Sequence, residues 1–315
     1  MPLTLAVRLL ALAAFNRVSC CVLLAVALLG NCGCRSLSSK GNDESISAAR
    51  QLSLQGREAQ QRGQWYQAES LYAAALAKCP KDDRARCGYA ESLWKRGAKG
   101  DAIQHMEESC RLSGGDPDRN VQLGRMYLDQ GELGLAEKQA DIAIAANKSL
   151  PQAWALKGDV YRAMGNSLDA ITNYQRALGL QSHYPEVQLA LAELHVQHKR
   201  PERALSTLQC LAASYPPGQI PVAIQHRQGL TLRSLGRHRE ACNCLATAAS
   251  HPSCTPELIH DLAETQMMLG DVSTARSLIQ SALQVNPSHT GLLRLHSELN
   301  GDTEQMASVA SHTLR

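Results

Sequence analysis

The chain has 315 residues, of which 44% are hydrophobic and only 4% aromatic, with a single Phe. This length is enough for about two domains, whose cores must be filled mainly by aliphatic side chains. The 32 Lys and Arg residues against 29 Asp and Glu residues give a formal net charge of +3, which excludes the strongly basic surface of a nucleic-acid-binding protein. With 19% charged residues, 22 Gly and 12 Pro, the chain is neither intrinsically disordered nor collagen-like.

The first 34 residues have the pattern of an export signal. Arg8 and Arg17 precede an unbroken apolar run, CCVLLAVALLG at 20–30, and the segment contains no acidic residue. A comfortable transmembrane helix needs about 20 apolar residues, so the run is too short for one. We therefore interpret 1–34 as an export segment rather than as part of the fold.

The end of this segment, LLGNCGC, resembles the lipobox of bacterial lipoproteins. The resemblance implies lipid attachment at Cys34, which follows Gly33, with Cys32 as the second choice. Asn31 departs from the family, which prefers an aliphatic residue there, so a cleaved signal without lipid and an uncleaved anchor remain alternatives. Arg35 is not acidic, which in that family favours the outer membrane. We expect an exported protein of the bacterial cell envelope, anchored to a membrane and facing the periplasm.

Residues 35–48 are rich in Ser, Gly, Asn and Asp and lack a helical apolar period, which predicts a flexible tether. The organised part is expected over 49–300, followed by a C-terminal tail at 301–315.

A pattern of small and bulky residues recurs through 49–300. Gly, then Ala five residues later, a bulky residue four after that and a small one three further on are seen as Gly63-Ala68-Tyr72-Ala75 and Gly165-Ala170-Tyr174-Ala177. Seven copies start at Gly63, Gly97, Gly131, Gly165, Lys199, Gly236 and Gly270. The steps between them are 34 residues, except for one of 37 that contains Pro216-Pro217-Gly218. A fixed period of this length indicates stacked repeats, none of which can bury its apolar face alone.

A small residue also lies seven positions before each of these starts, for example Gly56 and Gly158. Together with Trp154 and Tyr161, these residues resemble the tetratricopeptide repeat family. The resemblance implies an all-α, right-handed superhelical solenoid of about seven helix-turn-helix repeats plus a C-terminal capping helix. Repeats are expected to start near 49, 83, 117, 151, 185, 222 and 256, with a partial one from 290.

No catalytic or phosphate-binding motif is present in the sequence, so we predict a protein that is not an enzyme and has no cofactor and no small-molecule substrate. The alternative is an envelope-processing enzyme or a metal-binding module. It would use a cluster of His238, Cys242, Cys244, His251, Cys254 and His260. His238 and Cys242 share a helix face, but no C-x-x-C pair is present, so we expect no metal site. A disulfide between Cys87 and Cys110 is a further alternative.

The resemblance also implies a concave groove, lined by the first helix of each repeat, that binds a protein or peptide partner. The predicted partner-binding residues are Arg50, Arg57, Arg84, Glu91, Trp94, Arg125, Leu128, Arg162, Glu193, His226, Arg233, His260 and Met267. We expect Arg57, Arg84 and Arg125 to form a basic pocket with Trp94 as its aromatic wall. The partner would be protein and not nucleic acid, while the membrane is contacted through the N-terminal anchor.

Overall fold

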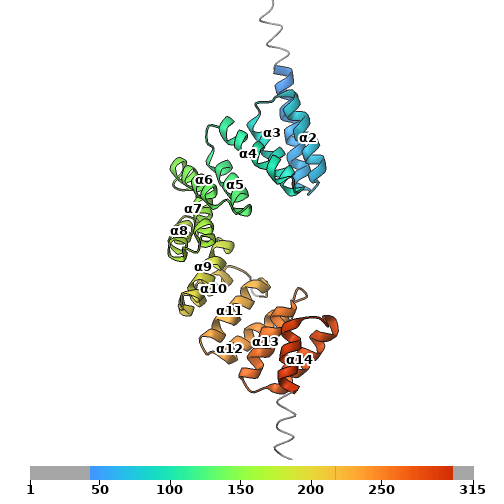
Figure 1. The fold of residues 1–315 in the computed structure, drawn as a ribbon, viewed down its shortest axis with the longest axis vertical. Helices are drawn as coiled ribbons and strands as arrows, with labels where there is room; N and C mark the ends of the chain where they lie inside the picture. The colour runs from blue at the N-terminus through green and yellow to red at the C-terminus, as the bar shows by residue number, and fades with distance from the viewer. Residues whose placement is uncertain (1–42, 217, 301–315) are drawn as a thin grey trace, which may run out of the picture. The chain divides into compact units, whose positions relative to one another are not determined.

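The computed structural model describes residues 43–216 and 218–300, which fold into α-helices joined by short connections (Figure 1). No β-strand occurs among these residues. The chain divides into two compact units, Met1–Glu132 and Leu133–Arg315, called unit 1 and unit 2 below and described separately. The predicted all-α fold of tandem helix pairs is confirmed.

Unit 1 contains five described helices. They are a helix over 43–61, α2 (Trp65–Lys78), α3 (Asp83–Lys95), α4 (Lys99–Leu112) and α5 (Pro117–Asp129). Residues 43–48, expected in the tether, belong to the first helix, because Ile46 and Ala49 already contribute to its packed face. The export segment with Cys32 and Cys34, and the rest of the tether, lie outside the described residues.

Unit 2 continues with the same alternation of first and second helices. Its helices are α6 (Leu133–Ala146), α7 (Pro151–Ala163), α8 (Ser167–Leu180), α9 (Pro185–Gln197), α10 (Pro201–Ala212), α11 (Val222–Ser234), α12 (His238–Ala249), α13 (Pro256–Met268), α14 (Val272–Val285) and a helix over 290–300. Within each unit, successive helices pack side by side (Figure 1). No described helix is both long and apolar enough to cross a membrane.

The first helices begin where local chemistry favours a helix start. Proline is at the N-terminus of α5, α7, α9 and α13, where its missing N–H costs no helical hydrogen bond. The side chains of Asp82, Asp116 and Thr255 accept hydrogen bonds from backbone N–H groups at the starts of α3, α5 and α13. Helices α3, α5, α7, α9, α11 and α13 begin at residues 83, 117, 151, 185, 222 and 256, near which repeats were expected to start.

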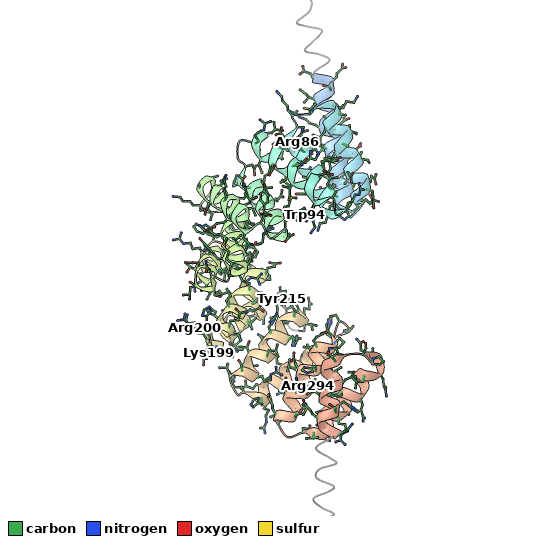
Figure 2. All side chains as sticks on the ribbon, in the orientation of Figure 1. Arg86, Trp94, Lys199, Arg200, Tyr215 and Arg294 are labelled. Atoms are coloured by element: carbon green, nitrogen blue, oxygen red, sulfur yellow. The ribbon has the colours of Figure 1, made fainter. Side chains whose placement is uncertain are left out.

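Each hairpin turn uses a residue in the left-handed backbone region, at the seven positions predicted from the repeat. Six are glycines with φ between 72° and 90°, and the seventh is Lys199 with φ 55°. A side chain is strained in this region, whereas glycine is not. The turn between α9 and α10, labelled by Lys199 and Arg200 in Figure 2, therefore keeps the geometry of the others without their usual residue.

Small residues allow the two helices of a pair to approach closely. The Ala five residues after each turn, such as Ala170 on α8, is fully buried in every copy. On α7, a Cβ atom added at Gly158 would lie 2.5 Å from Cδ1 of Tyr174, whose side chain is also fully buried. Tyr174 belongs to a cluster that includes Ile171 and Leu191 and thus joins α8 to α9. One bulky residue therefore fills the space between two repeats.

We predict that Gly158→Ala lowers the free energy of unfolding by about 1–3 kcal/mol, because the added methyl group displaces the Tyr174 ring. Gly179→Ala on α8 is the matched control, since no atom lies within 4 Å of the position of its Cβ, and it should leave stability unchanged or slightly raised. Urea unfolding followed by circular dichroism measures both. Equal stabilities for the two variants would contradict this account of the packing.

Candidate functional site

The candidate functional site is the face presented by the first helices of the repeats, called the first-helix face below. In unit 1 these helices are 43–61, α3 and α5, and in unit 2 they are α7, α9, α11 and α13. All thirteen predicted partner-binding residues lie on them. The structure divides these residues into those that bond to the neighbouring repeat and those that do not.

A chain of polar contacts crosses unit 1 between its first two repeats. The Tyr72 hydroxyl donates to Oε1 of Gln60 at 2.9 Å, and Nε2 of Gln60 donates to the carboxylate of Glu91. Burial, together with the charge of Glu91, raises the pKa of Tyr72 to about 12. The tyrosine therefore stays protonated and remains a donor. Glu91, predicted to bind a partner, thus ties helix 43–61 to α3.

Two further contacts tie α3 to α5 in unit 1. Arg119 forms an ion pair with Asp83 at 2.5 Å, and the Cys87 thiol donates to Oε1 of Gln122 at 3.2 Å. Burial, and then the charge of Glu91, raises the pKa of Cys87 to about 12, so the thiol remains protonated. Cys87 and Cys110 are both free cysteines, so the structure contains no disulfide between them.

Unit 1 also holds a pocket of about 550 Å³, called the arginine pocket. Three of its lining residues are the predicted Arg50, Arg57 and Arg84, and Tyr72 is the aromatic residue among them. Trp94 and Arg125, which were predicted to belong to this pocket, do not line it. The reason is position along α3, because Arg84 is at the start of this helix and Trp94 at its end.

Trp94 is half-buried, and the ammonium group of Lys99 lies 5.2 Å from its ring centroid. Figure 2 shows Trp94 at the opposite end of α3 from Arg86. Arg125 is exposed on α5 and Leu128 is half-buried.

In unit 2, four polar side chains join α11 to α13. Nε2 of His226 lies 2.7 Å from Oδ2 of Asp261, and Arg233 donates to Glu264 at 2.7 Å and contacts Oδ1 of Asp261 at 3.4 Å. Asp261, which the sequence analysis missed, is the centre of this network. The sequence did not single out Asp261, because this residue is adjacent to His260 and is not at one of the positions expected to line the groove.

Asp261 remains ionised in this network. Its burial alone would raise its pKa, but the hydrogen bond from His226 and the positive charges of Arg233, His226 and His260 outweigh burial and hold the pKa below its usual range. The carboxylate is thus a fixed negative charge that two predicted partner-binding residues, His226 and Arg233, contact.

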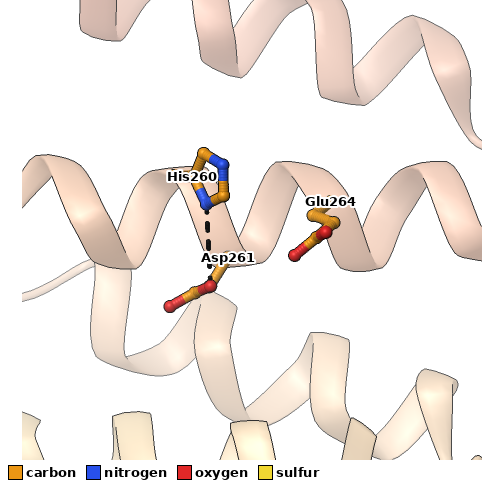
Figure 3. Close-up of side chains that lie close together, drawn as sticks. All are labelled: His260, Asp261 and Glu264. Atoms are coloured by element: carbon orange, nitrogen blue, oxygen red, sulfur yellow. Dashed lines mark ion pairs between the residues drawn. The ribbon is translucent and has the colours of Figure 1, made fainter. Parts of the chain in front are cut away.

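His260, Asp261 and Glu264 form the one group of three metal-type ligands among the described residues, with ligand atoms within 4.8 Å of one another (Figure 3). His260 Nδ1 is 3.6 Å from Oδ1 of Asp261. Both carboxylates are already paired with Arg233, a fixed cation that competes with a metal ion. The arrangement suits a structural ion-pair network better than a metal centre.

The His and Cys cluster proposed as an alternative site is not assembled. Cys242 is buried against Leu245 and Leu262, and the Cys244 thiol donates to the carbonyl of Gln225 at 3.2 Å. Only His260 from that cluster belongs to the group in Figure 3. Cys242 and Cys244 thus contact neighbouring helices and do not come together with the histidines in one site.

The first-helix face of unit 2 also has an apolar recess of about 190 Å³. Leu189 and Val196 of α9, Leu208 of α10 and Leu230 of α11 contribute to its lining. At its rim, Glu193 and Arg227 form an ion pair at 3.5 Å. The recess is thus lined by three successive helices, α9, α10 and α11.

The two remaining predicted residues differ in their surroundings. Arg162 is largely exposed on α7 and lies 4.0 Å from Asp159, which accepts a hydrogen bond from the Tyr174 hydroxyl at 2.6 Å. Met267 packs against the cluster formed by Ala263, Ile279 and Leu292, so its role in the structure is packing.

We predict that Asp261→Asn destabilises the chain by about 1–3 kcal/mol at pH 7, because it removes the charge that His226 and Arg233 bond. Since folding lowers the pKa of Asp261, its contribution is present above the unfolded pKa of about 3.9 and is lost as the pH falls through the folded value. Thermal unfolding from pH 7 to pH 3 should show the difference between variant and wild type shrinking. Glu186→Gln, an exposed position on α9, is the control and should show no such difference.

Comparison with known proteins places these repeats in a family. Models of the tetratricopeptide repeat match residues 53–117 and 161–220. A tetratricopeptide repeat protein from Parabacteroides merdae is 13% identical, with a TM-score of 0.57, over 80% of this chain and 99% of that one. Pseudomonas aeruginosa pilF is 16% identical, with a TM-score of 0.55, over 82% and 99%. YrrB is 17% identical, with a TM-score of 0.52, over 61% and 97%.

The search of curated proteins found no match. The family models, the period of the small residues and the helix pairs nevertheless agree with one another. Tetratricopeptide repeat proteins are generally non-catalytic scaffolds whose repeats bind protein or peptide partners. The chain belongs to the tetratricopeptide repeat family.

Proposed function

We propose that this protein is a non-catalytic scaffold that binds an extended segment of a partner protein on its first-helix face while tethered to a membrane of the bacterial cell envelope. The observation that carries the binding part is the apolar recess of unit 2. Solenoid repeats present such faces as extended binding surfaces.

The recess has the size and chemistry of a site for one apolar side chain. Its volume of about 190 Å³ is below the range of about 300–1,000 Å³ typical of small-molecule sites. Val196 on its wall is 40% exposed, so part of its apolar surface is free to be covered. The Glu193–Arg227 pair beside it offers both a donor and an acceptor to the backbone of an extended chain.

The similar structure YrrB is described as a tetratricopeptide repeat protein with an unusual peptide-binding site. At 17% identity the likeness extends to the fold, so it supports peptide binding as a class of function and identifies no residue. The partner proposed here is accordingly a peptide segment with an apolar anchor residue.

We predict that Val196→Asp weakens peptide binding at least about tenfold, because a carboxylate in the recess would lose hydration when an apolar side chain covers it. The measurement is selection of ligands from a random peptide library on the full-length chain, followed by affinity titration of the selected peptides with each variant. Selected peptides should share an apolar residue.

Leu168→Asp is the matched control, because Leu168 is 63% exposed on the second helix α8, away from the first-helix face. It should leave the affinity unchanged. Equal affinities of wild type and Val196→Asp for every selected peptide would remove the recess from the proposed function.

The membrane part of the proposal rests on the export segment, which lies outside the described residues. Cys34, with Gly33 before it and Arg35 after it, would carry the lipid and retain the protein at the envelope, with the outer membrane favoured. Several acyl chains give stable anchoring where one is marginal, so the lipidated form should stay with membranes through a salt wash.

We predict that labelled fatty acid enters the protein when it is expressed in a bacterial host and that Cys34→Ala abolishes the label, because the side chain of alanine has no thiol to which a lipid can be attached. Cys32→Ala alone should keep the label. Retention of label in the Cys32→Ala, Cys34→Ala double variant would defeat the lipoprotein proposal without affecting the proposal for peptide binding.

A further inference from the structure

The arginine pocket differs from the rest of the first-helix face in the state of its charges. Elsewhere the predicted groove charges are engaged, as Glu91 is with Gln60 and Arg233 with Glu264. No guanidinium group of Arg50, Arg57 or Arg84 forms a hydrogen bond or ion pair with another described residue. These three side chains line one cavity, so their mutual repulsion is not relieved within the described part of the chain.

The two acidic residues of the pocket lining are committed to other contacts. The side chain of Asp82 accepts from the backbone N–H groups of Arg84 and Ala85 at 3.1 and 3.0 Å, and Asp83 pairs with Arg119 at 2.5 Å. The pocket therefore keeps an excess of positive charge facing its interior.

A buried hydroxyl supplies an independent observation. Ser53 lines the pocket from helix 43–61, and its Oγ is buried yet has no hydrogen-bond partner among the described residues. Buried polar groups are nearly always hydrogen-bonded, and leaving one unpaired costs free energy. A ligand group that bonds this hydroxyl would recover that loss.

The spacing of two arginines fits an extended peptide. Arg50 and Arg57 are seven residues apart on one helix, about two turns, which corresponds to about 10 Å along the axis. In a polyproline II chain, residues three apart face the same side and lie about 9 Å from each other. Two carboxylates with three-residue spacing can therefore meet both guanidinium groups.

The remaining lining favours a peptide over a phosphate group. Ile46 and the half-exposed Leu54 give the pocket an apolar wall, which an apolar side chain between two acids would cover. The N–H groups at the start of α3, which would suit a phosphate, are already occupied by Asp82.

We propose that the arginine pocket binds an acidic extended segment of a partner protein, with carboxylates three residues apart on Arg50 and Arg57 and a further acceptor within reach of Arg84 and Ser53. This rests on the proposed function and specifies its partner chemistry. Charge contacts of this kind give orientation and fast association, while the apolar wall adds burial.

The test uses the full-length chain and the peptide fluorescein-Gly-Gly-Glu-Leu-Pro-Glu-amide, with the analogue in which both Glu are replaced by Gln. Fluorescence anisotropy should show binding of the acidic peptide only. Arg57→Gln should weaken it about tenfold, the effect of removing one charged hydrogen bond. Arg239→Gln, an exposed arginine on the second helix α12, is the charge-matched control and should bind like the wild type.

Ser53→Ala separates binding from folding. Removing an unpaired buried hydroxyl should leave the melting temperature unchanged or raised, whereas affinity for the acidic peptide should fall about threefold or more. A fall in melting temperature with unchanged affinity would instead show that Ser53 belongs to the fold and would overturn its part in the site.

Four results would overturn the proposal as a whole. They are equal binding of the Gln analogue, equal loss in Arg57→Gln and Arg239→Gln, displacement of the peptide by inorganic phosphate at lower concentration than by the unlabelled peptide, and absence of binding by the wild type. In each case the Val196→Asp comparison still decides the proposed function, because the apolar recess is in unit 2 and the arginine pocket in unit 1.

Discussion

The close approach of paired helices at small residues is the contact on which the rest of the structure depends. Where Gly158 faces Tyr174, the absence of a side chain on one helix makes room for a whole ring from the other. The ring then reaches the next repeat through Ile171 and Leu191. Alanine at the equivalent second-helix position, Ala170 here, is fully buried. Since each repeat buries its apolar surface on its neighbour, this spacing also sets where the first-helix face lies.

The first-helix face carries two kinds of charged residue, and the difference matters for function. Glu91 in unit 1, and His226 and Arg233 in unit 2, bond across to a neighbouring first helix at a separation near one repeat. These contacts hold successive repeats in register, so their loss acts through stability. Arg50 and Arg57 have no such contacts among the described residues and remain available to a ligand. A groove position is therefore a candidate for binding only after its contacts within the protein have been accounted for.

The arginine pocket of unit 1 and the apolar recess of unit 2 complement different features of a peptide. The arginine pocket offers positive charge with an apolar wall, and the recess near Val196 offers apolar surface with an ion pair at its rim. The second recess is formed where apolar side chains of three successive helices, α9, α10 and α11, meet.

The sequence by itself determined the fold and the phase of the repeats. The repeat period and the sizes of the residues determine the positions of the turns locally, so the sequence alone predicts turns at Gly63, Gly165 and Lys199. The same spacing predicted that the candidate partner-binding residues lie on the first helices, where the structure has them. Tertiary structure alone decided what each residue does there. The pairing of Asp261 with His226 and Arg233, the exclusion of Trp94 from the arginine pocket and the packing of Cys242 depend on which helix lies opposite. Such contacts join side chains from different repeats, and a one-dimensional pattern does not specify how far a side chain reaches across the gap between them.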